Sequence, residues 1–191
     1  MDLKTINNNI ISNEWDKRYD NLLPEIKEKL DLLEKSKPRE YLFKKKKNDK
    51  SYPDVGTVFE MVTPQNIIIN GLVINNNINS ILGRDLITII IFKLSTEIAS
   101  MEKMNICSEE ILIPPMIITS ELWTKGYAKN IGNIIYDLKE EYSFYDVITR
   151  KFFTDKGEID EKKGMTGIYG VSTVNGLSRQ IQRELIIQGL I

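Results

Sequence analysis

Apolar side chains between residues 15 and 33 recur at spacings of three and four, the period of an amphipathic helix. The stripe consists of Trp15, Tyr19, Leu22 or Leu23, Ile26, Leu30 and Leu33. Charged residues fill the intervening positions, as on a helix that packs against a domain and turns its polar face to solvent. Pro24 interrupts the stripe and removes a backbone hydrogen bond. The sequence therefore predicts two helices or one kinked helix, with Ser12 or Asn13 as the first N-cap.

The pattern changes to β-branched runs in the second quarter of the chain. Residues 57–62 alternate in part between apolar and polar, and residues 67–74 form a second predicted strand. Gly71 lies inside this second strand, where a glycine marks a bulge or the close approach of another segment. Turn-forming residues follow each run, so we expect turns at residues 64–66 and 75–77.

The strongest strand prediction is residues 86–92, because they are apolar on both faces, which is typical of a central strand. Residues 95–107 are ambiguous, and a short helix is one interpretation. Residues 111–118 contain a Pro-Pro pair and are predicted as two extended pieces hinged at that pair. Farther along, residues 155–157 are Asp-Lys-Gly, a sequence typical of a hairpin turn.

The last third of the chain combines glycine-rich segments with one helical pattern. Residues 123–133 have the aromatic and glycine pattern of a sheet corner, and residues 164–176 predict tight turns. The glycine spacing does not match a dinucleotide-binding fingerprint. A C-terminal helix with Ser178 as its N-cap is predicted from a final apolar stripe. That stripe consists of Leu177, Ile181, Leu185 and Ile186.

These patterns predict an α+β fold. We expect a twisted antiparallel sheet or a small SH3-like partial barrel, flanked by an N-terminal helical segment and a C-terminal helix. The predicted organisation is an N-terminal helical segment at residues 1–36, a basic connector at residues 37–53 and an α+β core domain at residues 54–191.

The side chains that carry much of enzyme chemistry are scarce in this chain. It has no histidine and a single cysteine, Cys107. This composition excludes histidine-based triads, zinc sites with histidine or four cysteine ligands, and a disulfide within the chain. Glu109 and Glu110 lie beside Cys107 and disfavour a thiolate, so we predict an inert cysteine. We therefore expect no enzyme activity, no catalytic residues, no cofactor and no metal site.

The sequence also bears on the compartment. The first 13 residues are polar and lack the apolar core of a signal peptide. The longest apolar run, residues 86–94, is far shorter than the roughly 20 residues that a transmembrane helix needs. We therefore predict a cytoplasmic protein that does not enter a membrane.

The formal net charge of −1 gives no general attraction to nucleic acid or to an anionic membrane. The strongly basic segment is the connector, with Lys37, Arg39, Lys44, Lys45, Lys46, Lys47 and Lys50. Such a segment fits either a phosphate-contacting patch or an edge strand whose lysines block pairing with another sheet. A nucleic-acid-binding regulator that uses residues 44–50 and Arg179, Gln180 and Arg183 of the C-terminal helix is the less favoured alternative function.

Acidic residues gather at Asp137, Glu140, Glu141 and Asp146. On a short helix, carboxylates three or four apart share one face, which is the arrangement of paired acid–base sites. Ordinary surface acids have the same spacing, and we favour that interpretation over catalysis. A third interpretation is an anionic patch that meets a cationic partner.

Several short phrases follow one another in a fixed order between residues 54 and 133. Residues 56–59 are Gly-Thr-Val-Phe, residues 70–74 are Asn-Gly-Leu-Val-Ile, and a Pro-Pro step precedes residues 116–118. Residues 125–133 are Lys-Gly-Tyr-Ala-Lys-Asn-Ile-Gly-Asn. This order resembles the immunity protein twenty-six family of bacterial polymorphic toxin systems. Members of that family carry a Gly-Asp-hydrophobic-Phe opening, a glycine-flanked strand and a Gly-x-Trp-x-x-Ile-Gly-Asn segment.

The chain departs from the family pattern in three ways. Thr57 replaces the aspartate of the opening. The tryptophan of the late segment is absent, with Tyr127 nearby and Trp123 farther upstream, and the N-terminal helical segment has no counterpart. The resemblance implies a small, mostly-β or α+β domain that binds and blocks a cognate toxin in the producing cell. Aromatic and acidic residues are then the expected partner-binding residues: Trp123, Tyr127, Asp137, Glu140, Glu141, Tyr142 and Tyr145.

Overall fold

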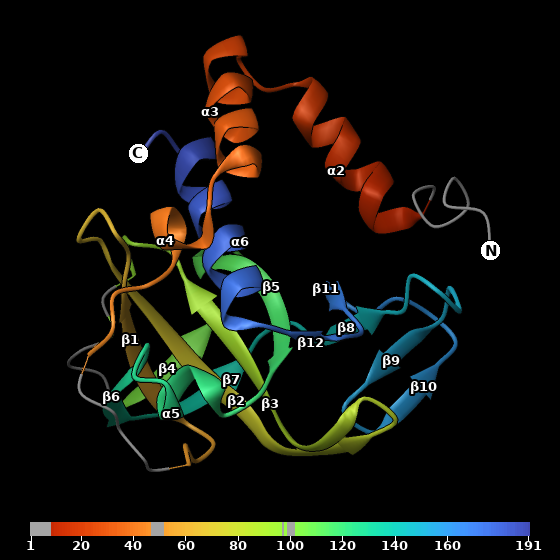
Figure 1. The fold of residues 1–191 in the computed structure, drawn as a ribbon. Coiled ribbons are helices and arrows are strands. Elements are labelled where there is room, and N and C mark those ends of the chain that lie inside the picture. Colours follow the sequence, from red (N-terminus) through yellow and green to blue (C-terminus); the bar gives the residue numbers. More distant parts are fainter. Residues whose placement is uncertain (1–8, 47–51, 97, 99–101) are drawn as a thin grey trace.

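A six-stranded sheet, here called the main sheet, forms the centre of the molecule (Figure 1). The computed structural model describes residues 9–46, 52–96, 98 and 102–191. Within these residues, the strand order of the main sheet is β12 (Val171–Ser172), β5 (Ile111–Ile118), β3 (Gly83–Phe92), β2 (Ile68–Ser80), β1 (Thr57–Val62) and β6 (Lys129–Asn133). Neighbouring strands are antiparallel except β12, which runs parallel to β5.

The strand β3 lies inside the main sheet and is buried on both faces, which confirms the prediction of a central strand. Ile87, Ile89 and Ile91 belong to one core cluster, and Ile90 and Phe92 belong to a second cluster. Successive side chains of a strand point to opposite faces of the sheet. A continuous apolar run is therefore stable only where other elements cover both faces.

The helix α6 (Val174–Ile187) covers one face of the main sheet (Figure 1). Leu177, Ile181 and Leu185 are buried in the same cluster as the isoleucines of β3, so the predicted apolar stripe is confirmed. The predicted cap is wrong. Thr173 caps the helix, because its hydroxyl oxygen accepts a hydrogen bond from the backbone N–H of Gly176 at 3.1 Å, and Ser178 is buried inside the helix.

The N-terminal segment folds into α2 (Ile10–Asp20), α3 (Pro24–Lys35) and α4 (Pro38–Tyr41). Pro24 begins α3, which confirms the prediction of two helices around this proline. The predicted first cap is wrong, because the Asn9 side chain accepts hydrogen bonds from the backbone N–H groups of Ile11 and Ser12. Leu30, Leu33 and Ile186 join α3 to α6 in a small cluster on the outer side of α6.

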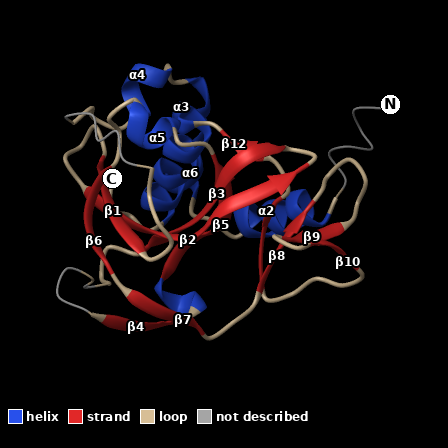
Figure 2. Ribbon diagram, turned by 90° about the horizontal axis from the view of Figure 1, so that it is seen from below, coloured by secondary structure: helices blue, strands red, loops and turns tan. Residues whose placement is uncertain are grey.

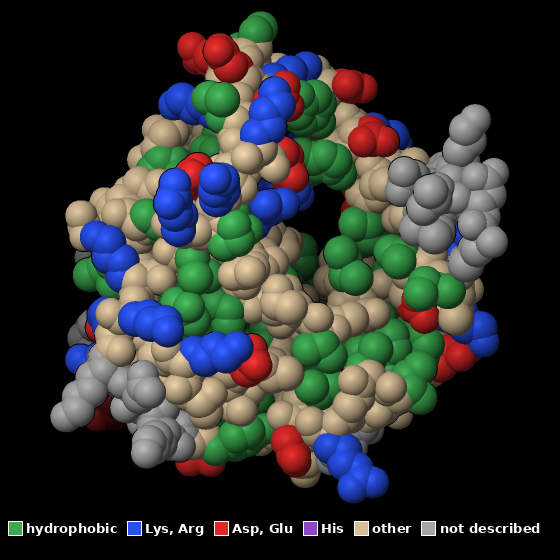
Figure 3. Space-filling view, in the orientation of Figure 1, with side chains coloured by type: hydrophobic (Ala, Val, Ile, Leu, Met, Phe, Trp, Pro, Cys, Tyr) green, Lys and Arg blue, Asp and Glu red, His purple; other side chains and the backbone are tan. Residues whose placement is uncertain are grey.

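The helix α2 stands apart from the sheets and is held by charged contacts and by Trp15 and Tyr19, which pack against the cluster of α3 and α6. Arg18 pairs with Glu184 at 2.6 Å, and the Arg183 guanidinium lies 4.4 Å from the centre of the Trp15 ring. Between α2 and the sheets lies a cavity of about 320 Å³, lined mostly by apolar residues that include Ile11 and Ile168. Figure 3 shows the corresponding opening.

Strands rather than helices cover the other face of the main sheet (Figure 2). A parallel pair is formed by β4 (Lys103–Ile106) and β7 (Ile135–Leu138). A smaller sheet has the order β10 (Gly157–Ile159), β9 (Phe152–Thr154), β8 (Tyr142–Tyr145) and β11 (Met165–Ile168). Ile106 and Ile134 belong to the same cluster as Phe92, whereas Phe144 belongs to a cluster with Ile78, Leu86 and Ile117.

These layers confirm the predicted α+β class, with a sheet flanked by an N-terminal helical segment and a C-terminal helix. Among the described residues the sheets do not close into a barrel, so the flanked sheet is the correct one of the two predicted architectures. The predicted sheet corner at residues 123–133 consists of the short helix α5 (Glu121–Thr124) followed by β6. No helix in the described part of the chain is long and apolar enough to span a membrane.

The predicted turn at residues 75–77 is wrong, because β2 continues to Ser80 and pairs with β3. The register shifts between Val73 and Asn75 and again before Ile78, so the asparagines lie in irregular parts of one long hairpin. Pairing with a neighbouring strand has outweighed the local turn preference of asparagine.

The predicted hinge at the Pro-Pro pair is also wrong, because residues 111–118 form the single strand β5. Ile89 pairs with Met116 and Ile91 pairs with Ile113, so β5 has one residue more than β3 between these pairs. The prolines occupy this bulge. Proline has no backbone N–H, and a bulge is a place in a strand where the ladder does not require one. In residues 95–107, residues 103–106 are strand rather than helix, and residues 97 and 99–101 lie outside the described residues.

Gly71 lies opposite Phe59 of β1. A Cβ atom added at Gly71 would lie 2.3 Å from Cζ of Phe59 and 2.9 Å from Cδ1 of Ile91, and both side chains are fully buried. The prediction that Gly71 marks a close approach is therefore confirmed. The aromatic ring of Phe59 occupies the space that any larger residue at this position would need.

We expect Gly71→Ala to lower the free energy of unfolding by about 1–3 kcal/mol, because it overpacks a filled core. The matched control is Gly132→Ala on β6, the other neighbour of β1, where an added Cβ meets no atom within 4 Å. The control should change stability by less than about 0.5 kcal/mol. Urea denaturation measures both, and equal losses would contradict the packing explanation.

Candidate functional site

The hairpin of β9 and β10 turns at Asp155 and Lys156, which confirms the turn predicted at residues 155–157. Thr154 pairs with Gly157, whose φ of 130° is a conformation that favours glycine. The turn contacts the irregular parts of β2 and β3 through the Asp155 side chain. A loop residue with a defined position on a rigid sheet is a common arrangement at binding sites.

The half-buried Asp155 carboxylate accepts hydrogen bonds from three side chains. Asn75 Nδ2 donates to Oδ2 at 2.9 Å, Thr88 Oγ1 donates to Oδ1 at 3.3 Å, and the Tyr142 hydroxyl donates to Oδ2. Thr88 is fully buried, so this contact satisfies a hydroxyl inside the sheet. All three donors are neutral side chains.

Two tyrosines lie close to this charge. Burial, followed by the hydrogen bond and charge of Asp155, raises the pKa of Tyr142 far above its ordinary value of 10.0. Burial, followed by the charge of Asp155, also raises the pKa of Tyr136, whose hydroxyl donates to the carbonyl oxygen of Ile74 at 2.9 Å. Both phenols therefore stay protonated and act as hydrogen-bond donors.

A groove of about 540 Å³ opens beside this hairpin, and we call it the hairpin groove. Its lining residues are Leu138, Lys139, Glu140, Glu141, Tyr142, Thr154, Asp155, Lys156, Gly157, Glu158, Ile159 and Lys163. A smaller cavity of about 260 Å³ lies on the other side of the hairpin, where the rings of Phe153 and Tyr169 stack 4.0 Å apart. Asp155 lines both spaces.

The charged side chains around the hairpin groove are mostly paired with one another. Lys163 pairs with Glu141 at 3.1 Å, and Lys151 pairs with Glu158 at 2.7 Å. The Ser108 hydroxyl donates a hydrogen bond to Glu140 at 2.7 Å. Exposed pairs of this kind contribute little stability, so they can exchange for contacts with a partner at low cost.

The groove brings together three of the predicted partner-binding residues: Glu140, Glu141 and Tyr142. Asp137 lies nearby on β7 and is exposed. The hydrogen bond and charge of Lys139, 2.8 Å away, lower the pKa of Asp137. The predicted acidic helix is wrong, because residues 135–138 are β7 and β8 begins at Tyr142, so these acids do not share a helix face.

The other three predicted partner-binding residues lie in the protein interior. Trp123 is fully buried, meets the Phe59 ring edge-on at 5.1 Å and donates from Nε1 to Asn130 Oδ1 at 2.7 Å. Tyr127 and Tyr145 are also buried. Their side chains pack in the core and offer almost no area to a partner, which corrects the prediction for these positions.

Asp155, Asn75 and Thr88 were not expected at a site. Asn75 and Asp155 carry the composition of turns, and Thr88 lies within an apolar strand. Thr88 is the one residue whose sequence context could have indicated this site, because a hydroxyl inside a strand that is buried on both faces must have a hydrogen-bond partner.

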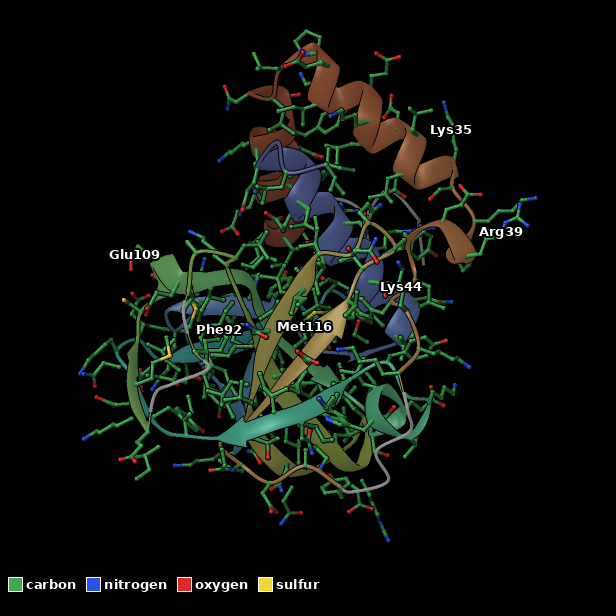
Figure 4. All side chains as sticks on the ribbon, turned by 90° about the vertical axis from the view of Figure 1, so that its left-hand side faces the viewer. Lys35, Arg39, Lys44, Phe92, Glu109 and Met116 are labelled. Carbon is green, nitrogen blue, oxygen red and sulfur yellow. The ribbon has the colours of Figure 1, made fainter. Side chains whose placement is uncertain are left out.

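Three consecutive lysines of the basic connector have partners within the protein. Lys44 and Lys46 contact Asn66 and Glu60 through side chains, and Lys45 lies 5.4 Å from the centre of the Tyr127 ring. Lys35 and Arg39 point away from the body, whereas Lys44 lies along the segment after α4 (Figure 4). Lys37 is exposed, and the connector lysines at positions 47 and 50 lie outside the described residues.

The arginines of the predicted nucleic-acid site serve the contacts between helices. Arg179 and Arg183 both pair with Glu34, at 3.3 Å and 3.0 Å. The Arg179 guanidinium also lies 5.0 Å from the centre of the Tyr41 ring. These cations therefore join α6 to α3 and α4.

Comparison with protein-family models gave no matching family, and searches of curated proteins and of solved structures gave no match either. Among residues 9–46, 52–96, 98 and 102–191, no group of three or more cysteine, aspartate or glutamate side chains is arranged to hold a metal ion.

The raised pKa of Tyr142 predicts a loss of stability at alkaline pH. Above pH 10, the unfolded chain releases the Tyr142 proton and the folded protein retains it, so the free energy of unfolding falls as pH rises. In Tyr142→Phe this fall should be shallower by about 1.4 kcal/mol per pH unit. Urea denaturation between pH 9 and 11.5 measures the difference, and parallel curves for the two proteins would refute it.

We also expect slow modification of Cys107. Its thiol donates a hydrogen bond to Glu110 Oε2 at 3.2 Å, and this bond, burial and the charges of Glu110 and Glu109 raise its pKa above 9.0. A chromogenic disulfide at pH 8 should therefore react more slowly with Cys107 than with free cysteine. Glu110→Gln should accelerate the reaction severalfold and the control Glu109→Gln much less. The same rate in all three proteins would be incompatible with this account.

Proposed function

We propose that this protein is an immunity protein, which binds a cognate bacterial toxin and neutralises it by covering part of its surface. The observation that supports this proposal is the hairpin groove, a preformed hollow lined by a tyrosine hydrogen-bonded to a carboxylate and by exposed ion pairs. Interfaces that bind tightly concentrate their energy in a central hollow and use rim charges for encounter and specificity.

The segments that resemble the immunity family are adjacent in the fold. Residues 57–59 lie on β1, residues 70–74 lie on β2 and residues 129–133 lie on β6, and β1 pairs with both of the others. Gly56 and Gly71 fit closely against Ile134 and Phe59, where an added Cβ would lie 2.6 Å and 2.3 Å from their atoms. These segments therefore serve packing, which leaves the hairpin groove outside them to recognise the partner.

The dimensions are compatible with a protein partner. A stable protein–protein interface buries about 1,600 Å² in total, and the groove would supply its centre. The partner then needs one projecting side chain or loop that enters the groove. The surrounding residues of β7, β8 and β10 would form the rim.

The alternative of a nucleic-acid-binding regulator has no specific observation in its favour. Lys44, Lys46, Arg179 and Arg183, which it requires, all contact other residues of this protein. Phosphate binding would have to compete with these contacts.

Co-expression tests the proposal directly. Bacteria that express the toxic module of a large secreted protein encoded immediately upstream should survive when this protein is expressed with it, and the two chains should co-purify. A double variant of exposed residues far from the groove, Lys35→Ala with Arg39→Ala, is the matched control and should protect equally well.

Absence of protection by a folded, well-expressed protein would refute an immunity function. Binding to random DNA that weakens steeply as salt rises would instead support the regulator. We expect no such binding.

A further inference from the structure

The Asp155 carboxylate has unused capacity to accept a hydrogen bond. A carboxylate offers about four acceptor positions, and Asn75, Thr88 and Tyr142 use three of them. Two of these bonds go to Oδ2, whereas Oδ1 has only the long 3.3 Å contact from Thr88. The open position is therefore on Oδ1, in a residue that lines the hairpin groove.

Asp155 differs from two of the other three acids of the groove in the charge of its partners, whereas Glu140 accepts its hydrogen bond from the neutral Ser108 hydroxyl. Glu141 and Glu158 are each paired with a lysine, and Asp155 has only neutral donors among the described residues. The surrounding protein screens the charge of a half-buried carboxylate less than water does, so the Coulomb attraction of a cation to it is greater than to an exposed acid.

The walls of the groove suit a long basic side chain. Leu138 and Ile159 line it together with the Tyr142 ring, and apolar surfaces of this kind pack against the methylene groups of lysine or arginine. The protonated phenol of Tyr142 keeps Oδ2 occupied, which leaves Oδ1 for an incoming donor.

We propose that the hairpin groove binds one arginine or lysine side chain of the toxin, whose cation donates to Oδ1 of Asp155. This inference rests on the immunity function proposed above and specifies the chemistry of its central contact. Lys156, the exposed residue at the tip of the hairpin, lies at the rim and takes no part in holding the cation.

A peptide titration tests the pocket without the toxin. The probe is acetyl-Gly-Arg-Gly-amide, compared with the same peptide carrying citrulline, which has the shape of arginine and no charge. With the full-length protein, the arginine peptide should shift the amide NMR signals of Lys156 and Gly157, and the citrulline peptide should not. Equal shifts with both peptides would overturn the proposal.

Variants separate binding from a structural role of Asp155. Asp155→Asn should weaken binding of the arginine peptide at least about tenfold, because a charge-assisted hydrogen bond is lost. Tyr142→Phe keeps the charge and frees an acceptor position, so it should bind the peptide at least as tightly as the unmodified protein. Asp160→Asn makes the same chemical change at an exposed residue just after β10 that does not line the groove; it is the matched control and should leave affinity within about twofold. Equal losses in Asp155→Asn and Tyr142→Phe would show that Asp155 acts only through the fold.

The same variants distinguish this proposal from the immunity function. If Asp155→Asn no longer binds the peptide but still protects bacteria as well as the unmodified protein, the groove is not the toxin contact. The cation proposal then fails, and the immunity function is unaffected. If the unmodified protein binds the peptide but gives no protection, the immunity function fails and the cation pocket stands. Loss of both peptide binding and protection in Asp155→Asn, with Asp160→Asn unchanged, supports both.

Discussion

The apolar run of β3 is the constraint on which the layers of this protein depend, because both faces of the strand must be kept from water. The helix α6 covers one face, and the strand pairs around β7 and β8 cover the other. Thr88 interrupts the run with a fully buried hydroxyl, which must be hydrogen-bonded. Asp155 accepts that bond, so a single polar position in the sheet fixes where the β9–β10 hairpin lies.

Much of the fold was predictable wherever one face of an element is apolar and long enough to show its period. The stripe of α6 and the central position of β3 follow from such patterns. The wrong predictions lie where the local conformational preference of a segment disagrees with its pairing to a neighbouring strand. Asparagine at 75–77 favours a turn, yet the strands on either side keep their pairing through register shifts. The Pro-Pro pair favours a break, yet a bulge accommodates it within β5.

The candidate site was less predictable, because composition does not tell which aromatic residue is buried. Trp123 and Tyr142 are both aromatic side chains with a polar atom and have polar neighbours in the sequence. Trp123 is nevertheless fully buried, in contact with the Phe59 ring and hydrogen-bonded to Asn130. Tyr142 keeps access to the groove because its hydroxyl is drawn to Asp155, which lies 13 residues later in the chain. That pairing depends on the tertiary fold, and no local pattern contains it.

Core packing and the proposed recognition of a partner involve different parts of this molecule. Around β1, the close contacts of Gly71 with Phe59 leave no freedom for side chains to change without loss of stability. The lining of the hairpin groove is half-exposed, and its rim pairs contribute little to folding. A protein that must match one partner while keeping its fold needs such a division, because residues of the rim can then vary independently of the core. The exception is Asp155, which belongs to both parts: its carboxylate accepts hydrogen bonds from Asn75 and Thr88 of the main sheet and also lines the groove, so the main sheet positions it there.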